Sequence, residues 1–406
     1  VCFDIKGSIP SNLNHLPINL ISKNVKDKYE NVFVFDCGNS QRLGVLEDIA
    51  LNSKNIVVVD HHIDPSFGDI QVIDSTAAST TQVLYREIIS SGIEIDKKRI
   101  ITSTEALKLK EVPKKIVVIG GGIIGLELGS VYSRLGSEVY VVEFLDRLIP
   151  SMDGSLGKEM LRTLKKQGIK FFLSHKVQGV KYTKDDLVVS ALNKKNEKIE
   201  FEADYCLVAV GRRPFTKRLN LKAAGIEVDE RGRVPVDENL QTKIEGIFAI
   251  GDVVRGTMLA HKAEEEGVFV AETLAGEKPH MNYKNIPSVL YTWPEAAGVG
   301  YTEEELISEN RSYKSGSFPF RALGRARAAM ETDGLVKILA DPMTDEVLGV
   351  HMMGARIADL IAEAVVALEF RASAEDLARI SHAHPTFAEA VKEAALDATA
   401  KRPLHL

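Results

Sequence analysis

The sequence predicts an α/β protein with more than one domain. Short runs of β-branched and aromatic residues alternate with helical stretches, which is typical of buried parallel strands joined by helices. Near residue 284 the composition changes again. At roughly 100–200 residues per domain, the 406 residues correspond to about two to four domains.

Composition and charge exclude several classes of protein. With 45% hydrophobic and 27% charged residues, the chain resembles an ordinary globular protein, not a disordered, collagen-like or low-complexity one. The formal net charge of −6 gives no sign of a nucleic-acid or anionic-membrane surface. No apolar run approaches the roughly 20 residues that span a bilayer, and no signal-peptide pattern is visible. We therefore expect a cytoplasmic protein.

Two apolar runs occupy residues 31–35 and 55–59, and each is followed by an aspartate. Four or five such residues in a row are typical of a buried parallel strand. Residues 77–89 then have the pattern of a helix. We expect residues 1–100 to form a partial parallel α/β sheet.

A clearer β-α-β unit begins at residue 115. The predicted strands of this part are residues 115–119, 138–142, 205–210 and 245–250, and a helix is predicted between the first two. Over residues 114–235 we expect a parallel sheet with helices on both faces. The chain has three widely spaced cysteines, of which Cys206 lies within an apolar strand and is expected to be a buried packing residue.

The last part, residues 284–406, has a different pattern. Strand-like pieces lie at residues 336–339 and 347–352, and helices are predicted at 358–370 and 386–398. We expect an antiparallel sheet with helices on one side, an α+β arrangement.

A glycine-rich turn follows the strand at 115–119. Gly120, Gly122 and Gly125 fit the pattern G-x-G-x-x-G. The first glycine allows a tight turn, the second lets a pyrophosphate approach the backbone, and the third lets helix and strand pack closely. The helix N-terminus then offers free N–H groups to the phosphates. By itself the pattern also fits an unrelated glycine-rich turn.

The context of this turn favours a dinucleotide site. Glu143 ends the next strand, 18 residues after Gly125. A carboxylate there can accept hydrogen bonds from both ribose hydroxyls of NAD and would repel the extra phosphate of NADP. The alternative is a solvated strand end. We predict a Rossmann-like NAD-binding domain with a parallel sheet.

Two further patterns carry possible chemistry. Asp252 follows an apolar run and a glycine, a place that suits a hydrogen bond to the sugar or ribityl hydroxyls of a second nucleotide, although a plain turn has the same pattern. Near the C-terminus, His384 lies five residues before Glu389. A carboxylate bound to one imidazole nitrogen fixes the tautomer and makes the other nitrogen a better base. On spacing alone the pair can also be structural.

Together these residues resemble the dihydrolipoamide dehydrogenases, flavoproteins among the FAD- and NAD-dependent disulfide oxidoreductases. The resemblance covers about residues 101–406. The stretches that carry it are Val117–Gly129, Val142–Leu145, Val210–Thr216, Ala249–Val254, Met258–Glu264 and His382–Ala390.

The resemblance implies a set of functional residues and partners. The implied NAD contacts are Gly120, Gly122, Gly125, Glu127, Glu143, Val177 and Gly211, and the implied FAD contacts are Asp252, Met258, Leu259, Ala260 and His261. His384 would be the general base that deprotonates a dihydrolipoyl thiol, oriented by Glu389, whereas His382 is taken as structural. The family also implies a homodimer, and lipoyl-bearing proteins of 2-oxo acid dehydrogenase complexes as partners.

The sequence departs from the family in two features. The family begins with an FAD domain that has its own G-x-G-x-x-G and a C-x-x-x-x-C redox pair, and neither is present in these 406 residues. Residues 236–283 resemble only the returning half of that domain. We therefore expect the lipoamide reaction to be incomplete in this chain, and a non-enzymatic dimeric NAD-binding protein is an alternative.

The first hundred residues resemble a different family. Val59-Asp-His-His62, with Asp36 before it and residues 67–69 and 74–80 after it, resembles the DHH phosphoesterases, in the branch of oligoribonucleases and phosphoadenosine-phosphate phosphatases. This resemblance implies Asp36 and His61 as ligands of Mn²⁺ or Mg²⁺ and hydrolysis of short oligonucleotides or phosphoadenosine phosphate as an alternative activity. It covers only a fragment of that family, so we expect a chimera.

The predicted organisation has five segments. They are a partial DHH-like α/β domain at 1–100, a linker at 101–112, the NAD-binding domain at 113–235, a partial FAD domain at 236–283 and an α+β dimerisation domain at 284–406.

Overall fold

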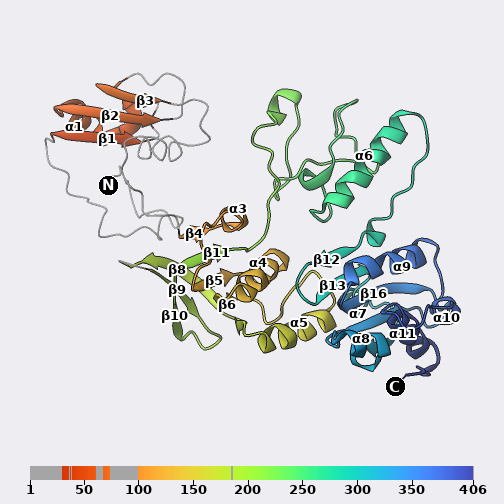
Figure 1. Ribbon diagram of the computed structural model, residues 1–406. Coiled ribbons are helices and arrows are strands. Elements are labelled where there is room, and N and C mark those ends of the chain that lie inside the picture. The colour runs from red at the N-terminus through yellow and green to blue at the C-terminus, as the bar shows by residue number, and fades with distance from the viewer. Residues whose placement is uncertain are drawn as a thin grey trace. The chain divides into compact units, whose positions relative to one another are not determined.

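The computed structural model describes residues 30–35, 37, 39–60, 67–73, 99–183 and 186–405. The chain divides into two units, Val1–Lys98 and Arg99–Leu406, and each is considered by itself (Figure 1). The division lies close to the boundary predicted at residue 100.

The first unit contains a parallel sheet of three strands. These are β1 (Asn31–Phe35), β2 (Asn55–Asp60) and β3 (Ile70–Ile73), paired in the order β1-β2-β3. The 3₁₀ helix η3 (Ser40–Leu46) and helix α1 (Glu47–Leu51) join β1 to β2. Val34, Cys37, Ile56 and Val58 form a small core. The two predicted strands are confirmed, whereas Asp36, His61 and the helix predicted at 77–89 lie outside the described residues.

The second unit begins with a parallel sheet, and we call residues 99–208 the parallel-sheet domain. Its strands run in the order β4-β11-β5-β6-β7. Their bounds are β4 (Ile100–Ile101), β5 (Lys115–Ile119), β6 (Glu138–Val142), β7 (Lys170–Phe172) and β11 (Tyr205–Val208), and the helices are α3 (Ser103–Ala106), α4 (Ile123–Arg134) and α5 (Gly154–Lys166). The predicted linker 101–112 instead begins inside this domain, because β4 pairs with β11 and Ala106 of α3 is part of the core.

The two faces of this sheet are covered differently. Ile116 and Val118 point into a core with the helices α4 and α5. On the other face, Val117 packs against a three-stranded antiparallel sheet of β8 (Lys176–Tyr182), β9 (Leu187–Leu192) and β10 (Lys198–Ala203). The prediction of helices on both faces is therefore wrong. Buried and partly exposed residues alternate along β9, the pattern of a sheet with only one face in the core.

Regular structure is sparse after β11. The described elements up to residue 285 are the 3₁₀ helices η4 (Leu221–Ala224), η5 (Gly251–Val253) and η6 (Tyr283–Asn285) and helix α6 (Ala260–Leu274). The strand predicted at 245–250 is not formed; Phe248 makes an isolated bridge with Gln241. None of the described strands pairs with it. Its backbone bonds instead to the short segment before it: the N–H of Ala249 donates to the carbonyl of Leu240 at 3.1 Å, and the N–H of Thr242 donates to the carbonyl of Ile247 at 2.8 Å.

Residues 286–405 form the antiparallel-sheet domain. Its strands are β12 (Ser288–Leu290), β13 (Glu295–Gly300), β14 (Lys314–Pro319), β15 (Leu335–Ala340) and β16 (Val347–Gly354), in the order β12-β13-β16-β15-β14. Its helices are α7 (Glu303–Ser308), η7 (Phe320–Ala322), α8 (Gly324–Ala329), α9 (Ile357–Glu369), α10 (Ala374–Arg379) and α11 (Glu389–Ala400).

The helices α9 and α11 pack on one face of this sheet, so the predicted α+β arrangement is confirmed (Figure 1). The helices are not all on one side, because Leu306 of α7 packs with Leu339 and Leu348, which alternate with the residues of that face. A Cβ atom on Gly316 of β14 would lie 2.0 Å from the backbone nitrogen of Ala398, so only glycine lets α11 approach so closely. Among the described residues, none of the helices has the length and apolar composition required to cross a membrane.

Candidate functional site

The glycine turn after β5 is shaped by two glycines and left open at the third. Gly120 has a φ of +110°, and a Cβ atom there would lie 2.5 Å from the carbonyl oxygen of Ala209. A Cβ atom on Gly125 would lie 2.1 Å from the carbonyl oxygen of Gly120. Gly122, the N-cap of α4, has no atom within 4 Å of its Cβ position. Gly120 and Gly125 are thus needed by the fold itself, whereas Gly122 faces free space.

Glu143 holds this turn from the end of β6. It is 8% exposed. One carboxylate oxygen accepts a hydrogen bond from the N–H of Gly121 at 2.6 Å, and the other accepts from the N–H of Leu145 at 2.7 Å. A carboxylate oxygen has two lone pairs, so each oxygen retains one acceptor position for a further donor.

A pocket of about 590 Å³ lies beside the turn, and we call it the strand-end pocket. It lies where β5, β6 and β11 end. In the sheet, β6 lies on one side of β5 and β11 on the other, so this is the switch point of the strand order. Ligands of open parallel sheets bind at this place. Of the predicted NAD contacts, Gly120, Gly122, Glu143, Val177 and Gly211 line this pocket.

Glu127 has a different place. Although it lies on α4, it does not line the strand-end pocket, and its carboxylate accepts a hydrogen bond from the N–H of Tyr291 at 2.8 Å. Burial raises the pKa of Glu127, and the bond from Tyr291 opposes this only in part. The structure thus places Glu127 in a contact between the parallel-sheet domain and the segment that follows β12.

The predicted FAD contacts lie around η5 and the start of α6. The side chain of Asp252 is 44% exposed and lies 3.5 Å from the guanidinium of Arg212. Met258 and the N-cap Leu259 precede Ala260 at the helix start, where no side chain caps the N–H groups. The side chain of His261 forms a hydrogen bond through Nε2 with the carbonyl of Pro287 at 2.8 Å.

These residues fit FAD only in part. A carboxylate and uncapped N–H groups are suitable for sugar hydroxyls and phosphates, but the 406 residues contain no second G-x-G-x-x-G. Two side chains of α6 hold the turn at Gly251. Glu266 accepts a hydrogen bond from the N–H of Gly251 at 2.6 Å, and Lys262 donates one to the carbonyl of Gly251 at 3.0 Å.

The predicted pair His384 and Glu389 is formed. Nδ1 of His384 donates to Glu389 at 2.8 Å, and the second carboxylate oxygen accepts from the N–H of Thr386 at 2.9 Å. Burial raises the pKa of Glu389, but the bonds from Thr386 and His384 outweigh it, so this pKa lies below its usual value. The side chain of His384 is 69% exposed, which leaves Nε2 accessible to a proton donor.

His382, which we predicted to be structural, is almost fully buried. Its Nε2 lies 2.7 Å from the carboxylate of Glu363, and this bond raises the pKa of His382. Cys206 is buried, and burial raises its pKa to about 12, so its thiol is unreactive at neutral pH.

The metal ligands predicted in the first hundred residues are not placed. Asp36 and His61 lie outside the described part of the chain. Within that part, no group of three or more His, Cys, Asp or Glu side chains is arranged to hold a metal ion.

Two family models match the chain: "Pyridine nucleotide-disulphide oxidoreductase" at residues 87–267 and its dimerisation domain at residues 286–395. The mitochondrial dihydrolipoyl dehydrogenase of Schizosaccharomyces pombe is 47% identical over 351 residues, which cover 84% of this chain and 69% of the relative. The chain belongs to the dihydrolipoyl dehydrogenase family.

Other relatives agree with this assignment. Mitochondrial dihydrolipoyl dehydrogenase 2 of Arabidopsis thaliana is 51% identical over 316 residues, 78% of this chain; the chain spans only 62% of that relative's length. A crystal structure of LpdA from Mycobacterium tuberculosis has the same fold, with a TM-score of 0.68 at 23% identity over 84% of this chain and 69% of that one.

The second resemblance has no such support. Both matching family models begin after residues 36–80, which carry the resemblance to DHH phosphoesterases. The relatives named here are dihydrolipoyl dehydrogenases. The comparisons therefore favour neither the phosphoesterase nor the non-enzymatic alternative.

Proposed function

We propose that this chain binds NAD(H) in the strand-end pocket and supplies the nucleotide-binding and dimerisation parts of a dihydrolipoyl dehydrogenase. Such an enzyme passes electrons from dihydrolipoyl thiols through FAD to NAD. The observation that carries the proposal is the open backbone at Gly122 beside the carboxylate of Glu143, at the switch point of a parallel sheet.

The described residues suit each part of the adenosine half of NAD. The pyrophosphate would lie against Gly122, where the first turn of α4 has no side-chain cap and offers N–H groups. Glu143 would accept hydrogen bonds from the ribose hydroxyls through the lone pairs that Gly121 and Leu145 leave available. A phosphate at the ribose 2′ position would meet a partly buried carboxylate, so NADH should bind better than NADPH.

The catalytic part of the proposal rests on His384. Because Glu389 holds Nδ1, Nε2 is the atom that would accept the proton of a dihydrolipoyl thiol, and Glu389 would stabilise the imidazolium that forms. A thiolate made in this way needs a disulfide to attack. These 406 residues contain no C-x-x-x-x-C pair, so we do not expect this chain alone to turn over lipoamide.

We also propose a homodimer, because residues 286–395 match the family's dimerisation domain. Lipoyl-bearing proteins of 2-oxo acid dehydrogenase complexes are the partners that such a function requires. The cytoplasmic location stays a prediction from the sequence; the plant and fission-yeast relatives carry names that place them in mitochondria.

The experiment is a fluorescence titration of the purified chain with NADH and NADPH. We expect NADH to bind at least about 10-fold more tightly than NADPH, and Glu143→Ala to weaken NADH by about 10- to 100-fold, the effect of one or two hydrogen bonds to a charged group. Glu138→Ala is the matched control, because Glu138 lies at the other end of β6 in an exposed pair with Lys170. Equal affinity of the wild type and Glu143→Ala for NADH would overturn the proposal.

A further inference from the structure

The segment between β6 and α5 forms one wall of the strand-end pocket. We call residues 144–153 the pocket loop. Phe144, Leu145, Pro150 and Ser151 of this loop line the pocket. No helix or strand is formed within the loop, so the position of this wall depends on side-chain and backbone contacts.

Contacts within the parallel-sheet domain fix the middle of the loop. The N–H of Ile149 donates to the carbonyl of Gly121 at 2.9 Å. The guanidinium of Arg147 donates to the carbonyls of Pro150 and Met152, at 3.2 and 2.6 Å. Arg147 thus holds the backbone of a pocket-lining residue, Pro150.

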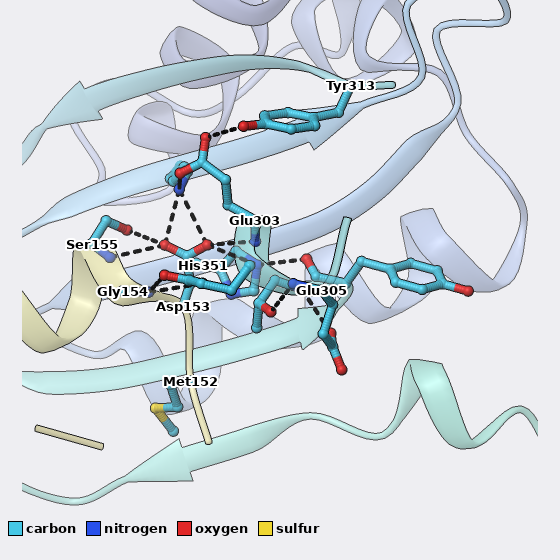
Figure 2. Close-up of polar contacts among 12 residues, drawn as sticks. Met152, Asp153, Gly154, Ser155, Glu303, Glu305, Tyr313 and His351 are labelled. Carbon is cyan, nitrogen blue, oxygen red and sulfur yellow. Dashed lines mark hydrogen bonds and ion pairs between the residues drawn. The ribbon is translucent and has the colours of Figure 1, made fainter. Parts of the chain in front are cut away.

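The antiparallel-sheet domain holds the end of the loop through a buried charge. Asp153 is fully buried and caps α5 by accepting from the N–H of Ser155 at 3.0 Å. Lys337 of β15, which is 7% exposed, donates to both oxygens of Asp153 at 2.9 and 3.1 Å. The N–H of Glu303, the first residue of α7, donates to the same carboxylate at 2.9 Å. Figure 2 shows the side chain of Ser155 and the backbone of Glu303 beside the carboxylate of Asp153, with the carboxylate of Glu303 turned toward Tyr313.

Two carboxylates in this cluster, those of Asp153 and Glu303, share one lysine. Lys337 also donates to Glu303 at 2.7 Å, and the hydroxyl of Tyr313 donates to the other oxygen of Glu303 at 2.7 Å. Burial raises the pKa of Asp153, but the charge that His351 carries when its ring is protonated and the bonds from Ser155, Glu303 and Lys337 outweigh it, so this pKa lies well below its usual range. Asp153 is therefore ionised at neutral pH and depends on Lys337 as its counter-charge.

A second contact from helix α7 reaches the pocket loop at Arg147. The carboxylate of Glu304 accepts from the N–H of Gly154 at 3.0 and 3.3 Å and lies 3.3 Å from the guanidinium of Arg147. Glu304, Arg147 and the carbonyl of Pro150 thus form a continuous chain of contacts from α7 to the pocket wall.

We propose that Lys337 and Glu304 are positioning residues for NAD(H): through Asp153 and Arg147 they hold the pocket loop, so that the antiparallel-sheet domain sets the shape of the nucleotide pocket. This inference rests on the proposed binding of NAD(H). An apolar contact would join two domains at least as well as a buried ion pair does. Here the two charged contacts act on the middle and the end of one pocket-lining segment, at Arg147 and Asp153.

Three variants test the positioning role by NADH titration together with thermal unfolding. Lys337→Met removes the counter-charge of Asp153. Gly154→Ala keeps every charge, but its Cβ atom would lie 2.2 Å from Glu304 and displace that carboxylate. We expect both to weaken NADH by about 3- to 30-fold, the range of coupling between groups in contact.

The third variant separates affinity from folding. Lys337→Met alone leaves a buried aspartate without a counter-charge and can fail to fold. The double variant Asp153→Asn/Lys337→Met leaves no unpaired charge at these two positions, and Glu303, which loses Lys337, keeps its bond from Tyr313. It should therefore recover most of the lost unfolding temperature while its affinity for NADH stays low.

Lys314→Met is the control, since it removes a lysine–aspartate pair with Asp345 elsewhere in the same sheet and should leave NADH binding unchanged. Wild-type affinity in both folded Gly154→Ala and the folded double variant would overturn the positioning role. A wild-type chain that binds no NADH would overturn the proposed function instead, so the two failures are distinguishable.

Discussion

Gly122 and Gly125 belong to one motif, but their surroundings differ. A Cβ atom on Gly125 would clash with the backbone of Gly120, whereas one on Gly122 would meet no protein atom within 4 Å. Gly125 is therefore required for the packing of α4 against β5, and Gly122 is required only if a ligand lies against the backbone.

This difference predicts opposite results for two alanine variants. Gly125→Ala should destabilise the chain by about 1–3 kcal/mol, as overpacked sites do. Gly122→Ala should change the free energy of unfolding by less than about 0.5 kcal/mol and yet weaken NADH by about 10-fold or more, corresponding to at least ~1.4 kcal/mol of binding free energy. Denaturant unfolding and NADH titration measure the two effects.

Gly179→Ala on β8 is the control for these variants, because its Cβ atom would also meet no protein atom within 4 Å and Gly179 does not line the strand-end pocket. It should leave both quantities unchanged. Wild-type affinity in Gly122→Ala would contradict the placement of the pyrophosphate.

Single residues could be predicted from the sequence where the partner is near in the chain or belongs to a motif. The contact of His384 with Glu389 was predicted in this way and is formed, and Glu143, which was also predicted, lines the strand-end pocket. The ion pair of Asp153 with Lys337 was missed because 184 residues separate the two. A signal did exist, since Lys337 interrupts the apolar run Leu335–Ala340, and a lysine in a buried strand requires a partner.

At the level of elements, apolar runs predicted strands well wherever another strand lies alongside. β5, β6 and the two strands predicted in the antiparallel-sheet domain are confirmed to within about two residues, the usual uncertainty of strand ends. The run at 245–250 has the same composition but no neighbouring strand among the described residues, and it forms only a bridge. Local composition cannot reveal whether a partner is available.

Strand β16 contains a buried histidine, and this predicts a pH dependence of stability. His351 donates through Nε2 to the carbonyl of Tyr301 at 2.8 Å and lies 4.0 Å from Asp153. Burial lowers the pKa of His351, and the charge of Lys337 adds to this, whereas Asp153, Glu304 and the bond to Tyr301 oppose it. The folded state therefore prefers the neutral ring.

Because the pKa of His351 is lowered in the folded state, the free energy of unfolding decreases in acid. The unfolded chain binds a proton below pH ~6.5 and the folded chain resists it, so this contribution to stability is lost as the pH falls from about 6.5. Asp153 and Glu303 have lowered pKa values and lose their contribution only below pH ~4. Since His382 has a raised pKa and acts in the opposite direction, a variant is needed to isolate His351.

His351→Gln should keep the bond to Tyr301 and remove the titration. Denaturant unfolding at pH 7 and pH 5 should show a loss of stability on acidification that is smaller in this variant than in the wild type, by up to about 2 kcal/mol. His280→Gln, at an exposed histidine, should leave the wild-type difference in place. An identical pH dependence in wild type and His351→Gln would contradict the assignment.

For the whole molecule, the order of the domains in the second unit could be predicted because each has its own pattern of strands and helices. The sequence did not reveal which elements cover each face of a sheet, and the antiparallel sheet β8–β10 was missed for that reason. The proposed nucleotide site is lined by residues from 119 to 211, and α7 and β15 contact the pocket loop that forms one of its walls. All of them lie in the second unit, so NADH binding should need neither the first unit nor a bound flavin.

Hydrogen–deuterium exchange with and without NADH tests the proposed binding of NADH in the strand-end pocket most directly, because it reports where in the chain a ligand acts. We predict slower exchange in the turn at 120–125, in the pocket loop at 144–153 and around Gly211, with a smaller effect in α7 and none in the described strands β1 to β3. NADH that binds without slowing exchange in the turn and the pocket loop would contradict the placement of NADH in the strand-end pocket.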